Sequence, residues 1–328
     1  MKDCVQTLLE LVHHAVISHP ELRPALQQIL PSNPISKHQY ADARTLSKAD
    51  GNNFTERFRE IVSDPLNLLI RRVPEAGYVD ENGCVTLHNG NRTPLAGNLA
   101  YYSDFSQILV INRGVHEPLE EFCFQNTIEK LKSKNAPVTM VELGAYWAHY
   151  SMWLMREVTQ ARCVMVEPVN ENLACGKNNF EINGFAGEWI NDFVGHSGFR
   201  LDQYLEERKL SSLTILHSDI QGYELEMING AKDSLINKLV DYIFISTHSQ
   251  DIHTSIVEEL NRFGYRVEVS SDFENHTTSC DGFVMASSPR VPEVFTSFRP
   301  LGRREIAMKH PSALVNFVNS LLPRLIPG

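Results

Sequence analysis

Apolar runs of five or six residues alternate with helical patterns through the second half of the chain. The runs typical of buried strands lie at residues 138–143, 163–167, 213–218 and 242–246. Helical periodicity covers residues 117–133, 171–183, 221–237 and 252–263. This alternation predicts an α/β fold with a doubly wound, mostly parallel sheet. Two later runs, at 265–269 and 282–286, predict an antiparallel hairpin at the edge of that sheet.

The rest of the chain has a different pattern. Residues 1–30 and 54–70 have helical periodicity, and residues 31–55 are polar and irregular. Between residues 75 and 115, glycine, proline and Asn-Gly pairs separate short β-type runs, among them 85–87 and 108–111. Residues 311–323 predict a terminal helix. We therefore expect a helical and β-hairpin extension at 1–111, the α/β domain at 112–290 and a helical tail at 291–328.

Composition narrows the class of protein. The 328 residues include 30 basic and 40 acidic side chains, and the formal net charge of −10 argues against a nucleic-acid-binding protein. No apolar run approaches the roughly 18–20 residues that span a bilayer, so no membrane association is expected. The six cysteines form no C-x-x-C pair. Reduced cysteines that serve in packing, in a cytoplasmic protein, are the expectation.

The end of the first strand carries a turn suited to a ligand. Glu142-Leu143-Gly144 is followed by a helix pattern, and glycine lets a ligand approach the backbone closely. No further glycine follows, whereas a dinucleotide fingerprint needs three. Glu167-Pro168 ends the second strand, 23 positions after Gly144, where a carboxylate can accept hydrogen bonds from ribose hydroxyls. This combination is typical of S-adenosylmethionine binding.

Residues 116–286 resemble the FkbM-type family of class I, S-adenosylmethionine-dependent methyltransferases. Residues 216–224, LHSDIQGYE, are similar to the family block L-K-x-D-x-E-G-x-E, with His217 in place of lysine and Gln221 in place of glutamate. His248 matches the histidine that ends the family's fifth strand, and Ser246 stands where the family usually has glutamate. Residues 116–121 resemble the segment that precedes the first motif, near the methionine end of the cofactor.

The resemblance implies a class I methyltransferase fold and methyl transfer to an oxygen nucleophile, on a sugar or another small metabolite. The acceptor hydroxyl must lose its proton, and His248 is the candidate base because its ordinary pKa lies near neutrality. Asp219, which ends the fourth strand, is expected to orient His248, to contact substrate or to hold a divalent ion. Asp192 and Phe193, after the third strand, are candidates for the adenine ring. The predicted cofactor contacts are Glu142, Gly144, Ala145, Tyr146, Glu167, Pro168, Asp192, Phe193, Asp219 and Gln221.

Candidate acceptor contacts come from the turn and from late loops. They are Trp147, His253, Glu274 and Asp281, with His276 nearby in the sequence. These side chains can line a pocket or join Asp219 around a divalent metal. Because Gln221 and Ser246 replace two carboxylates of the family, no metal ligand is assigned.

Two other functions remain open at this point. One is an NAD-dependent oxidoreductase of the Rossmann type, although the glycines missing after Gly144 count against it. The other is a catalytically silent, methyltransferase-like module that binds a partner, which the replaced carboxylates would permit. Binding of S-adenosylmethionine rather than NAD, and turnover of the methyl donor, distinguish these alternatives.

Overall fold

The computed structural model describes residues 61–101, 106–133, 136–279 and 281–322. The helical patterns expected in residues 1–30 and 54–60, and the irregular segment at 31–55, lie outside these residues. The strands of the main sheet are β3 (Val138–Leu143), β4 (Ala161–Val166), β5 (Glu188–Ile190), β6 (Leu213–Ser218), β7 (Val240–Thr247), β8 (Arg266–Ser271) and β9 (Gly282–Ser287). The four apolar runs and the late hairpin of the sequence analysis are thus confirmed as strands.

The seven strands have the order β5-β4-β3-β6-β7-β9-β8. Pairing is parallel from β5 through β7, while β9 is antiparallel to both β7 and β8. The chain moves outward from β3 to β5 in one direction and from β6 in the other, so the order reverses between β3 and β6. In such sheets ligands bind beyond the carboxyl ends of the strands at this reversal. The expected doubly wound, mostly parallel sheet with an antiparallel edge hairpin is confirmed.

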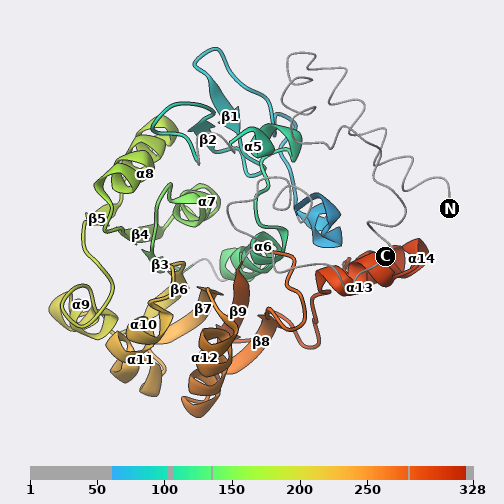
Figure 1. Ribbon diagram of the computed structural model, residues 1–328. Coiled ribbons are helices and arrows are strands. Elements are labelled where there is room, and N and C mark those ends of the chain that lie inside the picture. The colour runs from blue at the N-terminus through green and yellow to red at the C-terminus, as the bar shows by residue number, and fades with distance from the viewer. Residues whose placement is uncertain (1–60, 102–105, 134–135, 280, 323–328) are drawn as a thin grey trace.

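Helices cover both faces of the sheet (Figure 1). On one face lie α6 (Pro118–Lys132), α7 (His149–Glu157) and α8 (Asn170–Asn183); on the other lie α9 (Leu201–Glu207), α10 (Glu224–Gly230), α11 (Lys232–Ile236) and α12 (Gln250–Arg262). Side chains of one strand alternate between the two cores. Met140 of β3 joins the core under α6–α8, and its neighbour Val141 joins the core under α9–α12.

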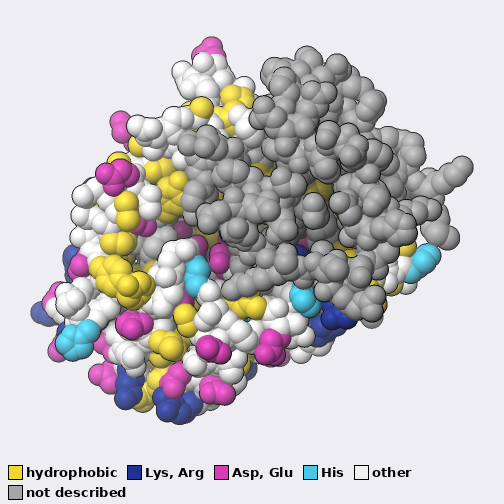
Figure 2. Space-filling view, viewed as in Figure 1, with side chains coloured by type: hydrophobic (Ala, Val, Ile, Leu, Met, Phe, Trp, Pro, Cys, Tyr) yellow, Lys and Arg dark blue, Asp and Glu magenta, His cyan; other side chains and the backbone are white. Residues whose placement is uncertain are grey.

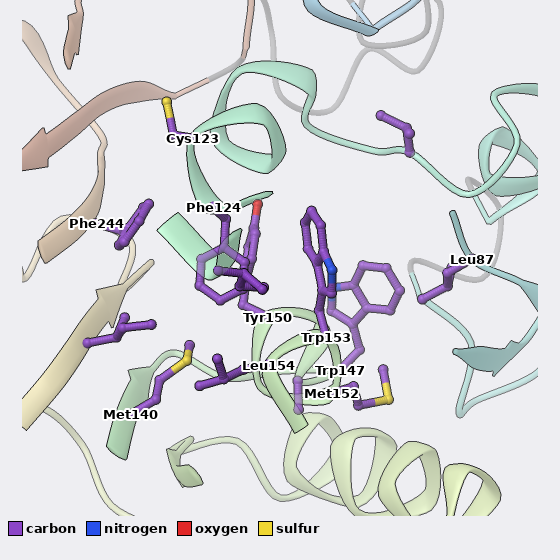
Figure 3. Packing of buried hydrophobic residues seen from close by; sticks show 14 of the residues in the cluster. Leu87, Cys123, Phe124, Met140, Trp147, Tyr150, Met152, Trp153, Leu154 and Phe244 are labelled. Carbon is purple, nitrogen blue, oxygen red and sulfur yellow. The ribbon is translucent and has the colours of Figure 1, made fainter. Parts of the chain in front are cut away.

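The core on the α6–α8 side is rich in aromatic rings. Trp153 and Tyr150 of α7 lie beside Phe124 of α6, and Phe244 of β7 faces the same cluster (Figure 3). The ring centroids of Phe124 and Tyr150 are 5.0 Å apart, and those of Phe124 and Phe244 are 5.4 Å apart. Large buried rings of this kind hold α6 and α7 firmly on the sheet.

Segments before α6 pack into the same core. They are the 3₁₀ helix η3 (Pro65–Leu69), the hairpin strands β1 (Cys84–Thr86) and β2 (Arg92–Pro94), and the short helix α5 (Gln107–Ile111). Buried side chains of this part, such as Leu87 and Leu109, share one hydrophobic cluster with α6 and α7. At the other end of the described chain lie α13 (Arg303–Met308) and α14 (Pro311–Leu321), the latter as expected.

Two expected elements differ. Residues 108–111 form most of α5, not a strand. Ile108, Leu109 and Val110 are all buried, and a fully buried apolar run fits a helical turn as well as a strand. The helix expected at 221–237 begins only at Glu224, because Gln221 (φ 53°) and Gly222 (φ 102°) are left-handed, and it divides into α10 and α11 at Ala231, whose backbone is not helical.

The surface carries charges of both signs. On the described part of the face shown in Figure 2, acidic and basic side chains are interspersed where Figure 1 places α9–α12. Among the described residues, no helix combines the length and the apolar character needed to cross a membrane. Cys84, Cys123, Cys163 and Cys175 are buried free thiols, so these four serve in packing.

Candidate functional site

The turn after β3 is locked to the loop after β6. A Cβ at Gly144 (φ 71°) would overlap the backbone carbonyl oxygen of Asp219, and the amide of Asp219 donates to the carbonyl of Leu143 over 2.9 Å. Gly144 is therefore required for packing of the two loops. A larger side chain at this position would collide with the protein's own backbone, so it would disturb the fold of the turn itself.

Glu167 lies directly after β4, and its carboxylate is hydrogen-bonded to the turn after β3. Its Oε2 accepts a hydrogen bond from the amide of Tyr146 (3.1 Å), and its Oε1 accepts one from the amide of Val169 (2.9 Å). Asn172 donates a further, longer bond to Oε1 (3.4 Å). A carboxylate has about four acceptor positions, so acceptor capacity remains for a ligand hydroxyl.

The other residues of the first turn are buried. The Glu142 carboxylate contacts α7, where its Oε2 accepts a hydrogen bond from the amide of Ser151 (3.1 Å). Ala145 is 3% exposed, and the ring of Trp147 is stacked on Tyr101 at 4.4 Å. Tyr146 is half-buried. Glu142 and Trp147 thus have partners inside the protein, and their roles toward cofactor and acceptor stay predictions.

Exposed side chains surround the turn on the β4 and β5 side. Pro168 and Asp192 are exposed, and Phe193 is 41% exposed. The Phe193 ring packs edge-on against Tyr223, which follows β6, at 4.4 Å between centroids. This aromatic pair links the loops after β5 and β6 and presents apolar surface beside Asp192. The sequence analysis did not single out Tyr223.

His248, directly after β7, is surrounded by carboxylates. Its Nδ1 lies 2.6 Å from Glu224 Oε1, and its Nε2 lies 3.3 Å from Asp219 Oδ1 and 3.6 Å from Asp281 Oδ1. Burial alone would lower the His248 pKa, but the contacts with Asp219 and Glu224 and the charge of Asp281 raise it to about 10. The ring is therefore protonated at neutral pH. The sequence analysis took the ordinary pKa near neutrality, and this is corrected.

Of the predicted acceptor residues, Asp281 contacts His248. Both ring nitrogens of His253 are engaged, Nδ1 with Thr247 Oγ1 and Nε2 with Ser270 Oγ, each at 2.9 Å. Glu274 is exposed on the loop between β8 and β9. Gln221 is exposed too, and it donates to Asp219 Oδ1 over 3.2 Å.

Glu120 of α6 is a site residue that the sequence analysis missed. Its Oε1 lies 2.5 Å from His217 Nε2, and its Oε2 accepts a hydrogen bond from Ser246 Oγ over 3.0 Å. His217 and Ser246 are two of the positions where the chain departs from the family pattern. A carboxylate is thus present beside them, supplied by a helix about 100 residues upstream. Residues 116–121 resemble the family segment that precedes the first motif. Nothing in the spacing of these residues indicates which strand they face.

A pocket lies beside these residues. The space within it, including the part that is open to solvent, is about 400 Å³. Polar groups from the loop before α6, from β7 and from the loop before β9 line it together with apolar side chains. The polar members include His116, Glu117, Glu120, Ser246, Thr278 and Asp281. Asp281 belongs both to the pocket wall and to the carboxylates around His248, so the pocket adjoins that histidine.

Asp219, His248 and Asp281 can also be considered as metal ligands. One ligand atom from each lies within 4.8 Å of the others. Two carboxylates and an imidazole suit a divalent cation, so the residues present fit such an ion.

Comparison with known proteins bears on this architecture. A family model described as methyltransferase FkbM domain matches residues 194–267. No curated protein matches the chain.

Several solved structures are similar to about half of the chain. One is a precorrin-6y C5,15-methyltransferase from Geobacter metallireducens GS-15, with 15% identity, a TM-score of 0.36, and coverage of 50% of this chain and 86% of the other. A ribosomal protein L11 methylase from Lactobacillus delbrueckii subsp. bulgaricus has 10% identity, a TM-score of 0.38, and coverage of 53% and 80%. An O-methyltransferase from Bacillus cereus in complex with SAH has 17% identity, a TM-score of 0.34, and coverage of 50% and 80%.

The family match runs from the loop after β5 into β8 and includes Asp219, Glu224 and His248. It also contains the sequence block 216–224. Over residues 194–267 the chain therefore matches the model of the FkbM methyltransferase domain, and the resemblance inferred from its motifs is confirmed.

Proposed function

We propose that this protein transfers a methyl group from S-adenosylmethionine to a hydroxyl of a sugar or another small, hydroxyl-rich metabolite. The observation that carries the proposal is the pocket that adjoins His248 at the carboxyl edge of the sheet, with carboxylates and hydroxyls among its apolar wall residues. Its carboxylates and hydroxyls can hydrogen-bond several hydroxyl groups of one acceptor. The acceptor class follows from the family resemblance.

The residues around the first turn fit the methyl donor. S-adenosylmethionine, when bound, supplies an electrophilic methyl group on a positively charged sulfonium. Glu167 retains acceptor capacity for the ribose hydroxyls. Asp192 can accept a hydrogen bond from the edge of the adenine, and the exposed face of Phe193 can pack against the plane of the ring. The carboxylate of Asp219 lies between this region and the pocket and is suited to a cationic ligand.

His248 is proposed to take the proton of the acceptor hydroxyl. Its Nε2 lies near Asp219 and Asp281, of which Asp281 also lines the pocket. Since its pKa is raised to about 10, the ring must first release its own proton. We therefore expect the methyl-transfer rate to increase with pH through the neutral range, with no plateau just above pH 6.5.

A metal-assisted variant of this reaction is a second candidate, favoured by the spacing of Asp219, His248 and Asp281. A divalent cation there would replace the proton of His248 and would make an acceptor hydroxyl more acidic. Chelation would then abolish turnover and Mg²⁺ or Mn²⁺ would restore it. In the metal-free mechanism, added Mg²⁺ or Mn²⁺ does not change turnover.

The deciding experiment measures S-adenosylhomocysteine formation with a panel of monosaccharides and other polyhydroxyl acceptors, alongside calorimetric titration with S-adenosylmethionine and with NAD. We expect S-adenosylmethionine to bind and at least one hydroxyl acceptor to be methylated. His248→Gln should lower kcat about 10²–10⁴-fold with little change in donor affinity. Asp251→Asn, at an exposed position of α12, is the matched control.

Three results would contradict the proposal. Binding of NAD without S-adenosylmethionine would indicate an oxidoreductase. Donor binding without turnover on any acceptor would indicate a silent binding module. Methylation confined to nitrogen or carbon acceptors would exclude the hydroxyl specificity.

A further inference from the structure

A second group of titratable side chains lies deep inside the protein, on the α6–α8 side of the sheet. His88 follows β1, Glu121 lies in the first turn of α6, and His149 is the first residue of α7. Their side chains are 1%, 0% and 1% exposed. Three separate segments of the chain therefore bring two imidazoles and a carboxylate to one point that solvent does not reach.

These three side chains leave buried polar atoms without hydrogen bonds. Neither ring nitrogen of His88 or of His149 has a hydrogen-bond partner, and Glu121 Oε2 has none. The other carboxylate oxygen, Oε1, lies 2.6 Å from His116 Nδ1 and accepts the His116 amide over 3.0 Å. Unpaired buried polar atoms are costly and uncommon, so five at one point indicate an occupant that supplies their missing contacts.

The spacing of the unpaired atoms suits a metal ion. His88 Nε2 lies 3.3 Å from Glu121 Oε2, and His149 Nε2 lies 3.5 Å from Glu121 Oε1. Four ligands at about 2.0–2.1 Å around a tetrahedral ion are separated by roughly 3.4 Å. One ligand atom from each of the three residues lies within 4.8 Å of the others.

The surroundings are also consistent with a cation. Burial lowers the pKa of His88 and of His149 to about 3, so both imidazoles are neutral and offer a lone pair. Arg72 is a nearby cation, but its hydrogen bonds are directed away from Glu121. It donates to the carbonyls of Asn67 and Ile70 and to the Asn67 side chain. Glu117 adds a second negative charge, with its Oε2 3.7 Å from His116 Nε2.

We propose that His88, Glu121 and His149 bind a divalent first-row transition metal ion, for which zinc is the probe. Two neutral imidazoles and a carboxylate are a ligand set that such ions accept, and a water can complete the coordination. The backbone amide of His116 orients the carboxylate by its hydrogen bond to Oε1. The ion fastens the loop after β1 to α6 and α7, and its role is structural.

The site also lies beside the candidate cofactor turn. His149 directly follows Ala148, whose left-handed backbone (φ 57°) precedes α7, and Tyr146 in the same turn has φ 40°. Such conformations are costly for residues other than glycine and persist where neighbouring structure fixes them. A metal bound to His149 would help to fix this turn.

The test is the metal content of the purified full chain, measured by mass spectrometry after expression with zinc. We expect about one ion per chain in the wild type, and a loss of at least tenfold in His88→Gln and in His149→Gln. His253→Gln is the matched control, because His253 is also buried but has both ring nitrogens hydrogen-bonded. Asp219→Asn tests the outer cluster, which is the group Asp219, His248 and Asp281. This variant should retain the ion.

A second measurement does not depend on the folding of any variant. Wild-type protein stripped with a chelator should unfold several degrees lower than the untreated protein, and zinc should restore the midpoint. Co²⁺ should give the visible absorption bands of a four-coordinate site. A wild-type chain without stoichiometric metal, whose unfolding midpoint is insensitive to chelator and zinc, would contain a buried water instead, and the proposal would be wrong. Metal lost in Asp219→Asn but retained in His88→Gln would place the ion in the outer cluster and would also overturn it.

Discussion

A Cβ at Gly144 would overlap the carbonyl oxygen of Asp219, and the φ of Gly144 is 71°. We expect Gly144→Ala to lower the free energy of unfolding by about 2 kcal/mol or more, through strain and displacement of the Asp219 loop. Chemical denaturation measures this effect. Gly184→Ala is the control, because Gly184 has the same φ but no atom within 4 Å of a Cβ. Equal losses in the two variants would show that the contact with Asp219 is unimportant.

The charge on His248 should make its contribution to stability depend on pH. Its pKa in the folded protein is raised to about 10, above the 6.5 of an unfolded chain. The stabilisation is therefore complete below pH 6.5 and decreases as pH rises toward 10. In chelator-containing buffer, the stability difference between wild type and His248→Gln should be larger at pH 6 than at pH 10. Urea unfolding at both pH values, with exposed His196→Gln as control, measures it; a difference that grows with pH would contradict the raised pKa.

Part of the candidate site could be predicted from single residues. Asp219 and His248 follow strands that their apolar runs identify, and neighbouring parallel strands end at one edge of the sheet. The contact between His248 and Glu224 could not be predicted in this way. It depends on left-handed backbone at Gln221 and Gly222, and only the glycine of that pair suggests such a conformation.

At the scale of elements, the long periodic segments were predictable and the short ones were not. Helices of three or more turns carry enough residues to establish a period, and the strands buried on both faces are apolar runs of five or six residues between those helices. Helix α5 has five residues, three of them buried, so its sequence contains no alternation. Helix α9, with seven residues, was not predicted at all. Its position beside the sheet depends on contacts between elements, which a local pattern does not contain.

The bridge from α6 to β6 and β7 gives a prediction at this scale. Glu120→Gln removes the charge opposite His217, whose pKa is lowered by burial but raised, on balance, by Glu120. We expect the free energy of unfolding to fall by about 1.5–3 kcal/mol, the range for hydrogen bonds to charged groups. Glu129→Gln on the same helix is the control, since the Glu129–Arg71 pair is exposed and should contribute at most about 1 kcal/mol. Similar small losses in both variants, in denaturant titrations, would exclude a stabilising bridge.

For the whole molecule, the shared core predicts that residues 61–111 unfold together with the sheet. Leu87 is fully buried in the cluster that includes α6 and α7. Leu87→Ala should lower global stability by about 2–5 kcal/mol, and circular dichroism and tryptophan fluorescence should report one transition. Leu68→Ala, at a residue that is 65% exposed, should change stability by less than about 0.5 kcal/mol. Two separate transitions would instead support an independent extension with a boundary near residue 111.

The Glu120 bridge also restricts the order in which this sequence can change. Ser246→Glu alone would restore the family's usual residue, but it would put a second carboxylate against Glu120 inside the protein. His217→Lys alone would keep a cation beside Glu120 but would lose the imidazole that fits there. To return to the common family pattern, the residue at position 120 must therefore change before, or together with, the residue at position 246. Grafting family motifs onto this protein one residue at a time should fail where a concerted exchange of the three positions succeeds.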